Sequence, residues 1–234
     1  MKEYQLNVDP RILELLGPNL YTNIYYVLAE LIANAYDADA KNVYIIANKD
    51  DIRVEDDGHG MSYDKGDIAN YLKVAGVSRI KEADSFSKSG ARRKMGRKGV
   101  GKLAALSVSE NVDILTVADG EKSGFVLSRH PEEGSKLRAI ADSDIAFDHV
   151  QDHGSAIVMR NPQYRLHKTL AAVKRNLLKI FPLMNSDFRI HVIRGDESEI
   201  IADFDQNVMA ELGTLIALGD EFSSLTSLVP NIYP

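Results

Sequence analysis

The stretch Glu30-Leu-Ile-Ala-Asn34-Ala-Tyr-Asp37-Ala-Asp39 decides how the rest of this sequence is interpreted. It closes the segment 22–37, in which apolar residues recur at helical spacing. At about 100° per residue, Glu30, Asn34 and Asp37 fall in a stripe roughly 60° wide, and an apolar face is centred about 120° from it. We therefore predict a helix that packs with one face and presents a carboxylate, an amide and a carboxylate on another.

These three side chains suit a particular chemistry. A carboxylate can orient and deprotonate water, and an amide oxygen is a hard ligand suited to Mg²⁺. Taken alone, the stripe is equally typical of a solvated helix face, so the interpretation depends on further motifs.

A second motif, Val54-Glu-Asp56-Asp-Gly58-His-Gly60-Met61, ends a short apolar-alternating run. Its glycines permit positive φ and close approach to the main chain. A carboxylate buried at the strand end could accept a hydrogen bond from an exocyclic amine. No second histidine stands at ligand spacing from His59, so we interpret His59 as a turn residue.

A third motif, Gly96-Arg-Lys-Gly-Val-Gly101-Lys102, leads into a helix expected over residues 98–106. Glycines at a helix N-terminus leave backbone amides free for an anion. The spacing also matches a P-loop. We reject the P-loop interpretation for two reasons. A P-loop has Ser or Thr after its lysine, whereas this chain has Leu103, and a P-loop follows a buried strand, whereas a basic segment precedes Gly96 here.

The segment 76–102 carries nine Lys or Arg against two acids, which makes it +7 within a chain of net charge −6. It is either a solvated surface run or a mobile loop that meets an anion. The composition, 44% hydrophobic and 26% charged over 234 residues, is that of a globular protein. The absence of cysteine excludes disulfides, thiolate zinc sites and a cysteine nucleophile. With no apolar membrane span or signal core, we expect a cytoplasmic protein with no membrane partner.

The order of predicted elements favours an α+β fold with one sheet and helices on one of its faces. We expect helices over 9–16, 22–37, 62–75, 98–106 and 164–181. We expect strands over 43–47, 52–55, 112–117, 124–128, 137–140, 155–159 and 188–193.

Together the motifs resemble the GHKL ATPase superfamily, or Bergerat fold, shared by DNA gyrase B, heat-shock chaperones of the ninety-kilodalton class, MutL and histidine kinases. A fourth element, His153-Gly-Ser155-Ala-Ile-Val158, is similar to the family's Gly-Thr-x-Ile strand, with Ser in place of Thr. The resemblance covers roughly residues 20–195 and is nearest to the chaperone (Hsp90-like), MutL and microrchidia-type branches. It implies a two-layer α/β sandwich, with a mixed, mostly antiparallel sheet and a flexible ATP lid.

The resemblance also implies ATP and Mg²⁺ as ligands and assigns roles to residues. Glu30 matches the general base, Asn34 the Mg²⁺ ligand, Asp37 an acid that supports the same site, and Asp56 the carboxylate that recognises adenine. Further matches shape the adenine pocket (Gly58, Gly60, Met61, Ser155) or bind phosphate (Gly96, Lys98, Gly99, Val100, Gly101, Lys102). The basic residues 76–95 match the lid.

We accordingly expect an ATP-binding domain over residues 1–195, with 196–234 as the start of a following transducer or middle domain. The expected activity is Mg²⁺-dependent ATP hydrolysis by a nucleotide-gated, dimerising clamp, completed by the downstream domain. The alternative is an ATP-sensing or scaffold module without turnover; histidine-kinase phosphotransfer fits less well. Whether the clamp closes on a client protein or on nucleic acid is left open.

Overall fold

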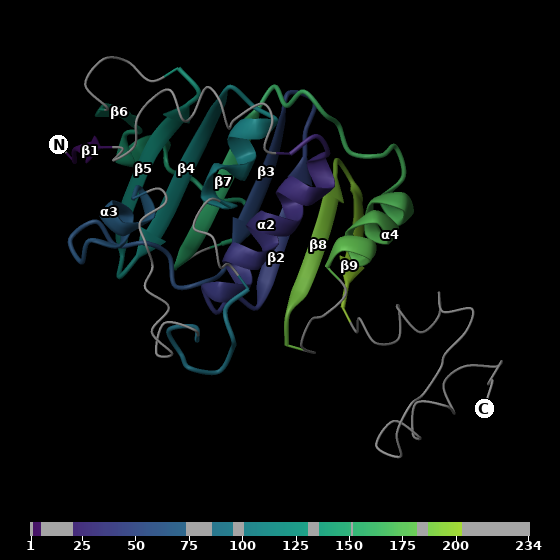
Figure 1. The fold of residues 1–234 in the computed structure, drawn as a ribbon, viewed down its shortest axis with the longest axis horizontal. Helices are drawn as coiled ribbons and strands as arrows, with labels where there is room; N and C mark the ends of the chain where they lie inside the picture. The colour runs from purple at the N-terminus through teal and green to yellow at the C-terminus, as the bar shows by residue number, and fades with distance from the viewer. Residues whose placement is uncertain are drawn as a thin grey trace.

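A computed structural model of the chain describes residues 2–5, 21–73, 86–95, 101–130, 136–150, 152–181 and 187–202. Within these residues, nine strands form one sheet, in the order β1-β6-β5-β4-β7-β3-β2-β8-β9. Only β2 and β8 pair in parallel; the other neighbouring pairs are antiparallel. The predicted α+β sandwich with a mixed, mostly antiparallel sheet is confirmed, and Figure 1 shows the helices in front of the sheet.

The strands run as follows: β1 Tyr4–Gln5, β2 Asn42–Ala47, β3 Asp51–Asp56, β4 Asn111–Ala118, β5 Glu121–Ser128, β6 Lys136–Ala139, β7 Gly154–Arg160, β8 Arg189–Arg194 and β9 Glu197–Ile201. The helical elements are α2 Ile24–Asp37, α3 Asp67–Tyr71, the 3₁₀ helices η2 Gly101–Ser107 and η3 Asp142–Asp144, and α4 Leu170–Ile180. β9 was not foreseen; it pairs with β8 beyond residue 195.

The helix predicted over 22–37 is confirmed as α2. The side chain of Asn23 caps it by accepting a hydrogen bond from the backbone N–H of Tyr25 at 2.9 Å. Its apolar residues lie in the main core between helix and sheet (Ile24, Val27, Leu28, Leu31, Ile32, Ala35). α2 contacts both η2 and α4 in the helical layer.

Three helix predictions were wrong in extent or type. Residues 62–66 form turns instead of helix, and α3 begins at Asp67 after Gly66, whose φ is +79°. The helix expected over 98–106 is a 3₁₀ helix from Gly101 to Ser107, and residues 164–169 precede α4 without joining it. The helix predicted over 9–16 lies outside the described residues.

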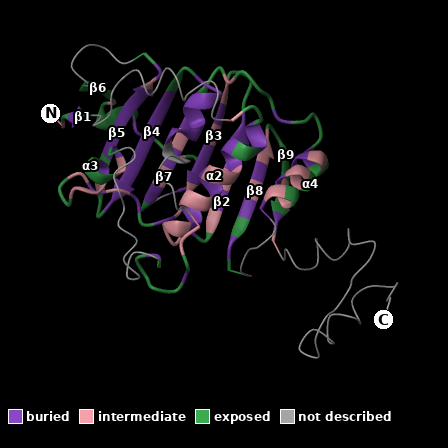
Figure 2. Cartoon of the chain, viewed as in Figure 1, coloured by how far each residue is buried: buried purple, intermediate pink, exposed green. Residues whose placement is uncertain are grey.

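The sheet separates two apolar layers. Ile114, Phe125 and Met159 belong to the large core beneath α2. The alternate residues Leu115 and Val158 face the other way, where they pack with Ile145 in a smaller cluster. Buried residues accordingly run along the central strands and the sheet-facing side of α2 in Figure 2.

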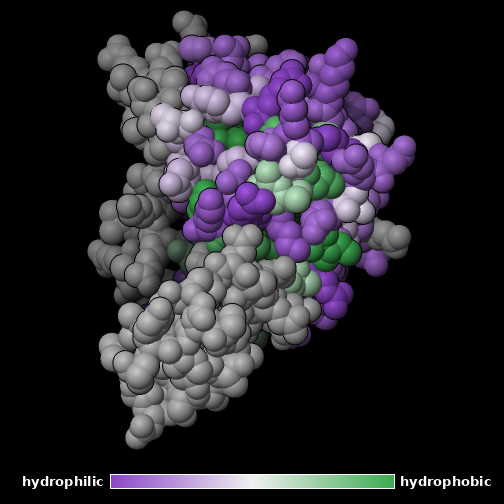
Figure 3. All heavy atoms as spheres, turned by 90° about the vertical axis from the view of Figure 1, so that its right-hand side faces the viewer, coloured by the Kyte–Doolittle hydropathy of each residue, from purple (hydrophilic) through white to green (hydrophobic). Residues whose placement is uncertain are grey.

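The end of the molecule that carries α4 and β9 presents mainly hydrophilic residues, interrupted by separate hydrophobic ones (Figure 3). Ile200 on β9 is 53% exposed. No helix in the described ranges is both long and apolar enough to cross a membrane.

Candidate functional site

The three polar residues predicted to share one face of α2 lie on a partly exposed face of the helix, as the helical period predicts. Glu30, Asn34 and Asp37 are half-buried, whereas Leu31 and Ala35 between them are buried. Oε1 of Glu30 accepts a hydrogen bond from the Tyr21 phenol at 2.9 Å. Among the described residues, no side chain hydrogen-bonds to the Asn34 carboxamide.

Asp56 is the last residue of β3, and it pairs with Ser155 of β7. The backbone N–H of Gly58 donates to Oδ1 of Asp56 at 2.9 Å. Burial of the carboxyl raises the pKa of Asp56 to about 7, with a further upward contribution from Asp57. Backbone hydrogen bonds from Gly58 and Ser155 oppose this rise. Asp56 is therefore a half-buried residue whose carboxyl is desolvated and hydrogen-bonded by backbone N–H groups at the strand end, where a carboxylate that recognises an amine was predicted.

The turn after β3 is folded tightly against its neighbours. A Cβ at Gly60, where φ is +66°, would lie 2.1 Å from the carbonyl oxygen of Val117. At Gly58 a Cβ would lie 2.8 Å from the carbonyl oxygen of Ala38, just after α2. The His59 N–H donates to that same carbonyl at 3.0 Å. These close approaches bring the turn against both β4 and the C-terminal end of α2.

Thr116 is the site residue that the sequence analysis missed. It is fully buried on β4, on the face of the sheet that carries α2. Its hydroxyl accepts from the Met61 N–H at 2.8 Å, donates to the Gly154 carbonyl at 3.0 Å and lies 3.3 Å from the Ser155 hydroxyl. A threonine amid apolar residues of a strand, at the same parity as buried Val112 and Ile114, was the available signal.

Thr116 thus contacts two positions that the sequence assigned to one pocket, Met61 and Ser155, and Ser155 pairs in turn with Asp56. Met61, Ser155 and Asp56 come from separate parts of the chain and meet through β4 and β7. The glycine of the fourth motif is needed there too, because a Cβ at Gly154 would lie 2.0 Å from the carbonyl oxygen of Asp56.

Residues 86–95, the described part of the basic segment, are fixed to the C-terminal end of α2. The backbone N–H of Met95 donates to Asp37 at 2.7 Å, and Ser89 donates to Asp39 through its N–H at 2.9 Å and its hydroxyl at 2.7 Å. Arg92 is only 8% exposed and donates to the carbonyl of Ala40 at 2.6 Å. These contacts hold residues 86–95 against α2 in this structure, and residues 76–85 of the expected lid lie outside the described residues, so the lid stays a prediction.

The predicted phosphate loop lies largely outside the described residues, which end at Met95 and resume at Gly101. Gly101 and Lys102 begin η2, whose contact with α2 places the loop's exit beside the polar helix. The assignments of Gly96, Lys98, Gly99 and Val100 therefore stay predictions. Among the described residues, no cluster of three His, Asp or Glu side chains could hold a metal by itself.

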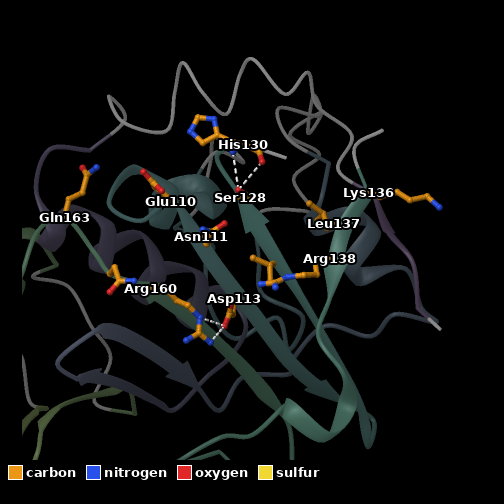
Figure 4. Close-up of a pocket in the computed structure, with 12 residues that line it drawn as sticks. Glu110, Asn111, Asp113, Ser128, His130, Lys136, Leu137, Arg138, Arg160 and Gln163 are labelled. Atoms are coloured by element: carbon orange, nitrogen blue, oxygen red, sulfur yellow. Dashed lines mark hydrogen bonds and ion pairs between the residues drawn. The ribbon is translucent and has the colours of Figure 1, made fainter. Parts of the chain in front are cut away.

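A cavity of about 870 Å³ lies on the opposite face of the sheet (Figure 4). Asp113 of β4 points into it and forms an ion pair with Arg160 of β7. Since Ile114, the next residue of β4, faces α2, this cavity is separated from Asp56 and Thr116 by the thickness of the sheet. None of the predicted site residues that the structure describes lines it.

Residues 21–155 match the family model described as histidine kinase-, DNA gyrase B- and HSP90-like ATPase. The chain belongs to this family, the GHKL ATPase superfamily.

Two relatives are similar to the chain. It is 27% identical over 224 residues to the protein named "Putative type II restriction enzyme HgiDII" of Herpetosiphon aurantiacus, with 94% of this chain and 36% of that protein covered. It is 35% identical over 101 residues to the DNA mismatch repair protein MutL of Bacteroides fragilis, with 42% of this chain and 15% of that protein covered. The chain thus spans about a third or less of the relatives it matches.

Proposed function

We propose that this domain binds Mg·ATP between α2 and the ends of β3, β4 and β7, and hydrolyses it. The observation that carries the proposal is the desolvated Asp56 carboxyl at the end of β3, where Asp56 pairs with Ser155 of β7, in a chain of this family. A buried carboxylate acceptor suits the exocyclic amino group of adenine, because an unpaired buried polar group on either side would be costly. Gly58 and Gly60 give the ring access to the main chain, and Met61 lines the pocket.

The stripe of α2 supplies the groups for the phosphate end. Glu30 takes a proton from water as the water oxygen forms a bond to the γ-phosphorus. The bond from that phosphorus to the β–γ bridging oxygen breaks, and its electron pair leaves with ADP. The products are ADP and inorganic phosphate, with the proton first held on Glu30.

Asn34 fits a metal-binding role, because its carboxamide is half-buried and has no hydrogen-bond partner among the described side chains. Together with phosphate oxygens it would hold Mg²⁺, which neutralises charge that develops on the phosphates. The glycine-rich loop 96–101, with Lys98 and Lys102, completes the proposed binding of phosphate.

Asp37 has a more specific role in this proposal than the resemblance alone implied. Its Oδ1 receives the Met95 N–H, and the proposed phosphate loop starts at the next residue, Gly96. Asp37 therefore fixes the entry of that loop relative to Asn34, one turn earlier on the same helix.

In the whole protein we propose that ATP binding brings two such domains together as a clamp. The relatives are named for restriction and for DNA mismatch repair, so DNA is the partner to test first. Clamping would appear as ATP-dependent dimerisation that DNA strengthens. A scaffold without turnover would dimerise with ATP and release no phosphate.

The deciding experiment is calorimetric titration of the domain with Mg·ATP and Mg·GTP. Guanine carries a carbonyl where adenine carries the amino group, so Asp56 should favour ATP strongly. Asp56→Asn should weaken ATP binding by about ten- to a hundredfold, since a site's hydrogen-bonding carboxylate is lost. The matched control is Asp113→Asn, a carboxylate on the opposite face of the sheet. Equal ATP affinity in wild type and Asp56→Asn would refute the adenine assignment.

A further inference from the structure

Tyr21 holds one oxygen of the predicted general base. Its phenol donates to Oε1 of Glu30 at 2.9 Å, across nine positions of sequence. In the described part of the chain, no other side chain is hydrogen-bonded to Glu30. Tyr21 lies before α2 begins, so this contact is distinct from the usual pairing of helix neighbours.

The ring of Tyr21 is well placed to act as a fixed support. It is partly buried and packs against the main core. The Asn23 cap, two residues later, defines where α2 starts and thereby how the chain enters it. Burial and the Glu30 carboxylate raise the pKa of Tyr21 to about 12, so the phenol remains a proton donor throughout the physiological range.

We infer that Tyr21 is a positioning residue, which fixes the rotamer of Glu30 and leaves Oε2 as the oxygen that accepts the proton from water. The inference rests on the proposed role of Glu30 as general base. A free glutamate side chain samples several rotamers, whereas a base must stand within hydrogen-bond reach of the water it activates. The phenol removes that freedom by holding Oε1.

The test uses the full-length protein and separates turnover from binding. Tyr21→Phe keeps the ring and its packing but removes the hydroxyl. We expect kcat for phosphate release to fall about tenfold or more, the effect of one hydrogen bond to a charged group, with the Kd for Mg·ATP unchanged within about twofold. The control is Tyr26→Phe, which removes the hydroxyl of a tyrosine that is 50% exposed on α2 and should alter neither quantity.

A double-mutant cycle with Glu30→Ala shows whether the loss of kcat in Tyr21→Phe depends on Glu30. If Tyr21 acts through Glu30, then Tyr21→Phe changes kcat little once Glu30 is gone. Unchanged kcat in Tyr21→Phe, an equal loss of kcat in the Glu30→Ala background, or a parallel loss of ATP affinity overturns the inference. The proposed function fails separately: Glu30→Ala would then retain wild-type turnover, whatever the Tyr21 variant does.

Discussion

The guanidinium of Arg92 lies 4.6 Å from the ring centroid of Tyr36 and 5.5 Å from that of Phe188. It also donates to the carbonyls of Tyr36, in the last turn of α2, and of Ala40, just after the helix, at 3.3 and 2.6 Å. A cation is favourable at a helix C-terminus, because the last carbonyls there lack partners. Arg92, one of the basic residues of the expected lid, is thus buried, and its contacts hold residues 86–95 against α2.

The first prediction concerns the stability of this anchor. Arg92→Met should lower the free energy of unfolding by about 2–4 kcal/mol, because buried carbonyls lose a charged donor and two rings lose their cation. Denaturant unfolding measures the change. Arg93→Met is the matched control, since Arg93 is exposed; it should change stability by about 0.5 kcal/mol or less. Similar losses in both variants would contradict the anchoring role.

The second prediction concerns the nucleotide-free state. The amides of Ser89 and Met95 donate to Asp39 and Asp37, so they should exchange slowly with solvent even without ATP. The sequence predicts that protection over residues 77–94 increases with a non-hydrolysable ATP analogue more than with ADP; residues 77–85 of that range lie outside the described residues. Rapid exchange at Met95 in the absence of nucleotide would argue against the anchor.

The third prediction tests the close approach of Gly60, in the turn after β3, to the backbone of β4. Gly60→Ala should destabilise the domain strongly, because its Cβ would meet the Val117 carbonyl oxygen at 2.1 Å and the backbone would have to move. Gly66→Ala is the control: φ is also positive, at +79°, but nothing lies within 4 Å. It should cost only about 1 kcal/mol for the backbone conformation. Equal changes in thermal midpoint would show that sterics at Gly60 are unimportant.

Features fixed by local sequence periodicity could be predicted, whereas features that depend on contacts between distant segments could not. The α2 stripe and the strand ending at Asp56 were predictable, because local periods of 3.6 and 2 fix which side chains share a face. Thr116 was missed since its importance arises from partners at positions 61, 154 and 155, which only pairing of β4 with β7 brings together. The contacts of Arg92 could not be predicted for the same reason: composition counts a charge but does not show which distant carbonyls and rings lie around it.

The fourth prediction separates chemistry from metal binding on α2. Glu30→Ala should leave ATP affinity nearly intact and lower turnover of the intact protein by about 10²–10⁴-fold, the usual contribution of a positioned base. Asn34→Ala should instead abolish the part of ATP affinity that depends on Mg²⁺. Titrations with and without EDTA, alongside phosphate release, distinguish the two. Undiminished phosphate release after removal of Glu30 would eliminate it as the base.

The last prediction follows from the pKa of Asp56, about 7 in the unliganded domain. The ionised carboxylate is the better acceptor for the adenine amino group, so binding favours the deprotonated form. Affinity should therefore fall as the pH is lowered from 8 to 6, by about tenfold, since the ionised fraction falls by about that factor. Adenosine is the suitable probe because it carries no phosphate that titrates in this range.

The raised pKa of Asp56 also predicts how the free energy of unfolding changes with pH. The native Asp56 holds its proton up to about pH 7, whereas the unfolded chain releases it near the ordinary value of 3.8. In this window the native state binds more protons, so Asp56 makes the free energy of unfolding fall as the pH rises from about 4 to 7. Asp56→Asn should remove this contribution together with the pH dependence of adenosine affinity. If the variant and the wild type show the same pH profile, the titrating group is not Asp56, and the carboxyl is not the acceptor that adenine meets.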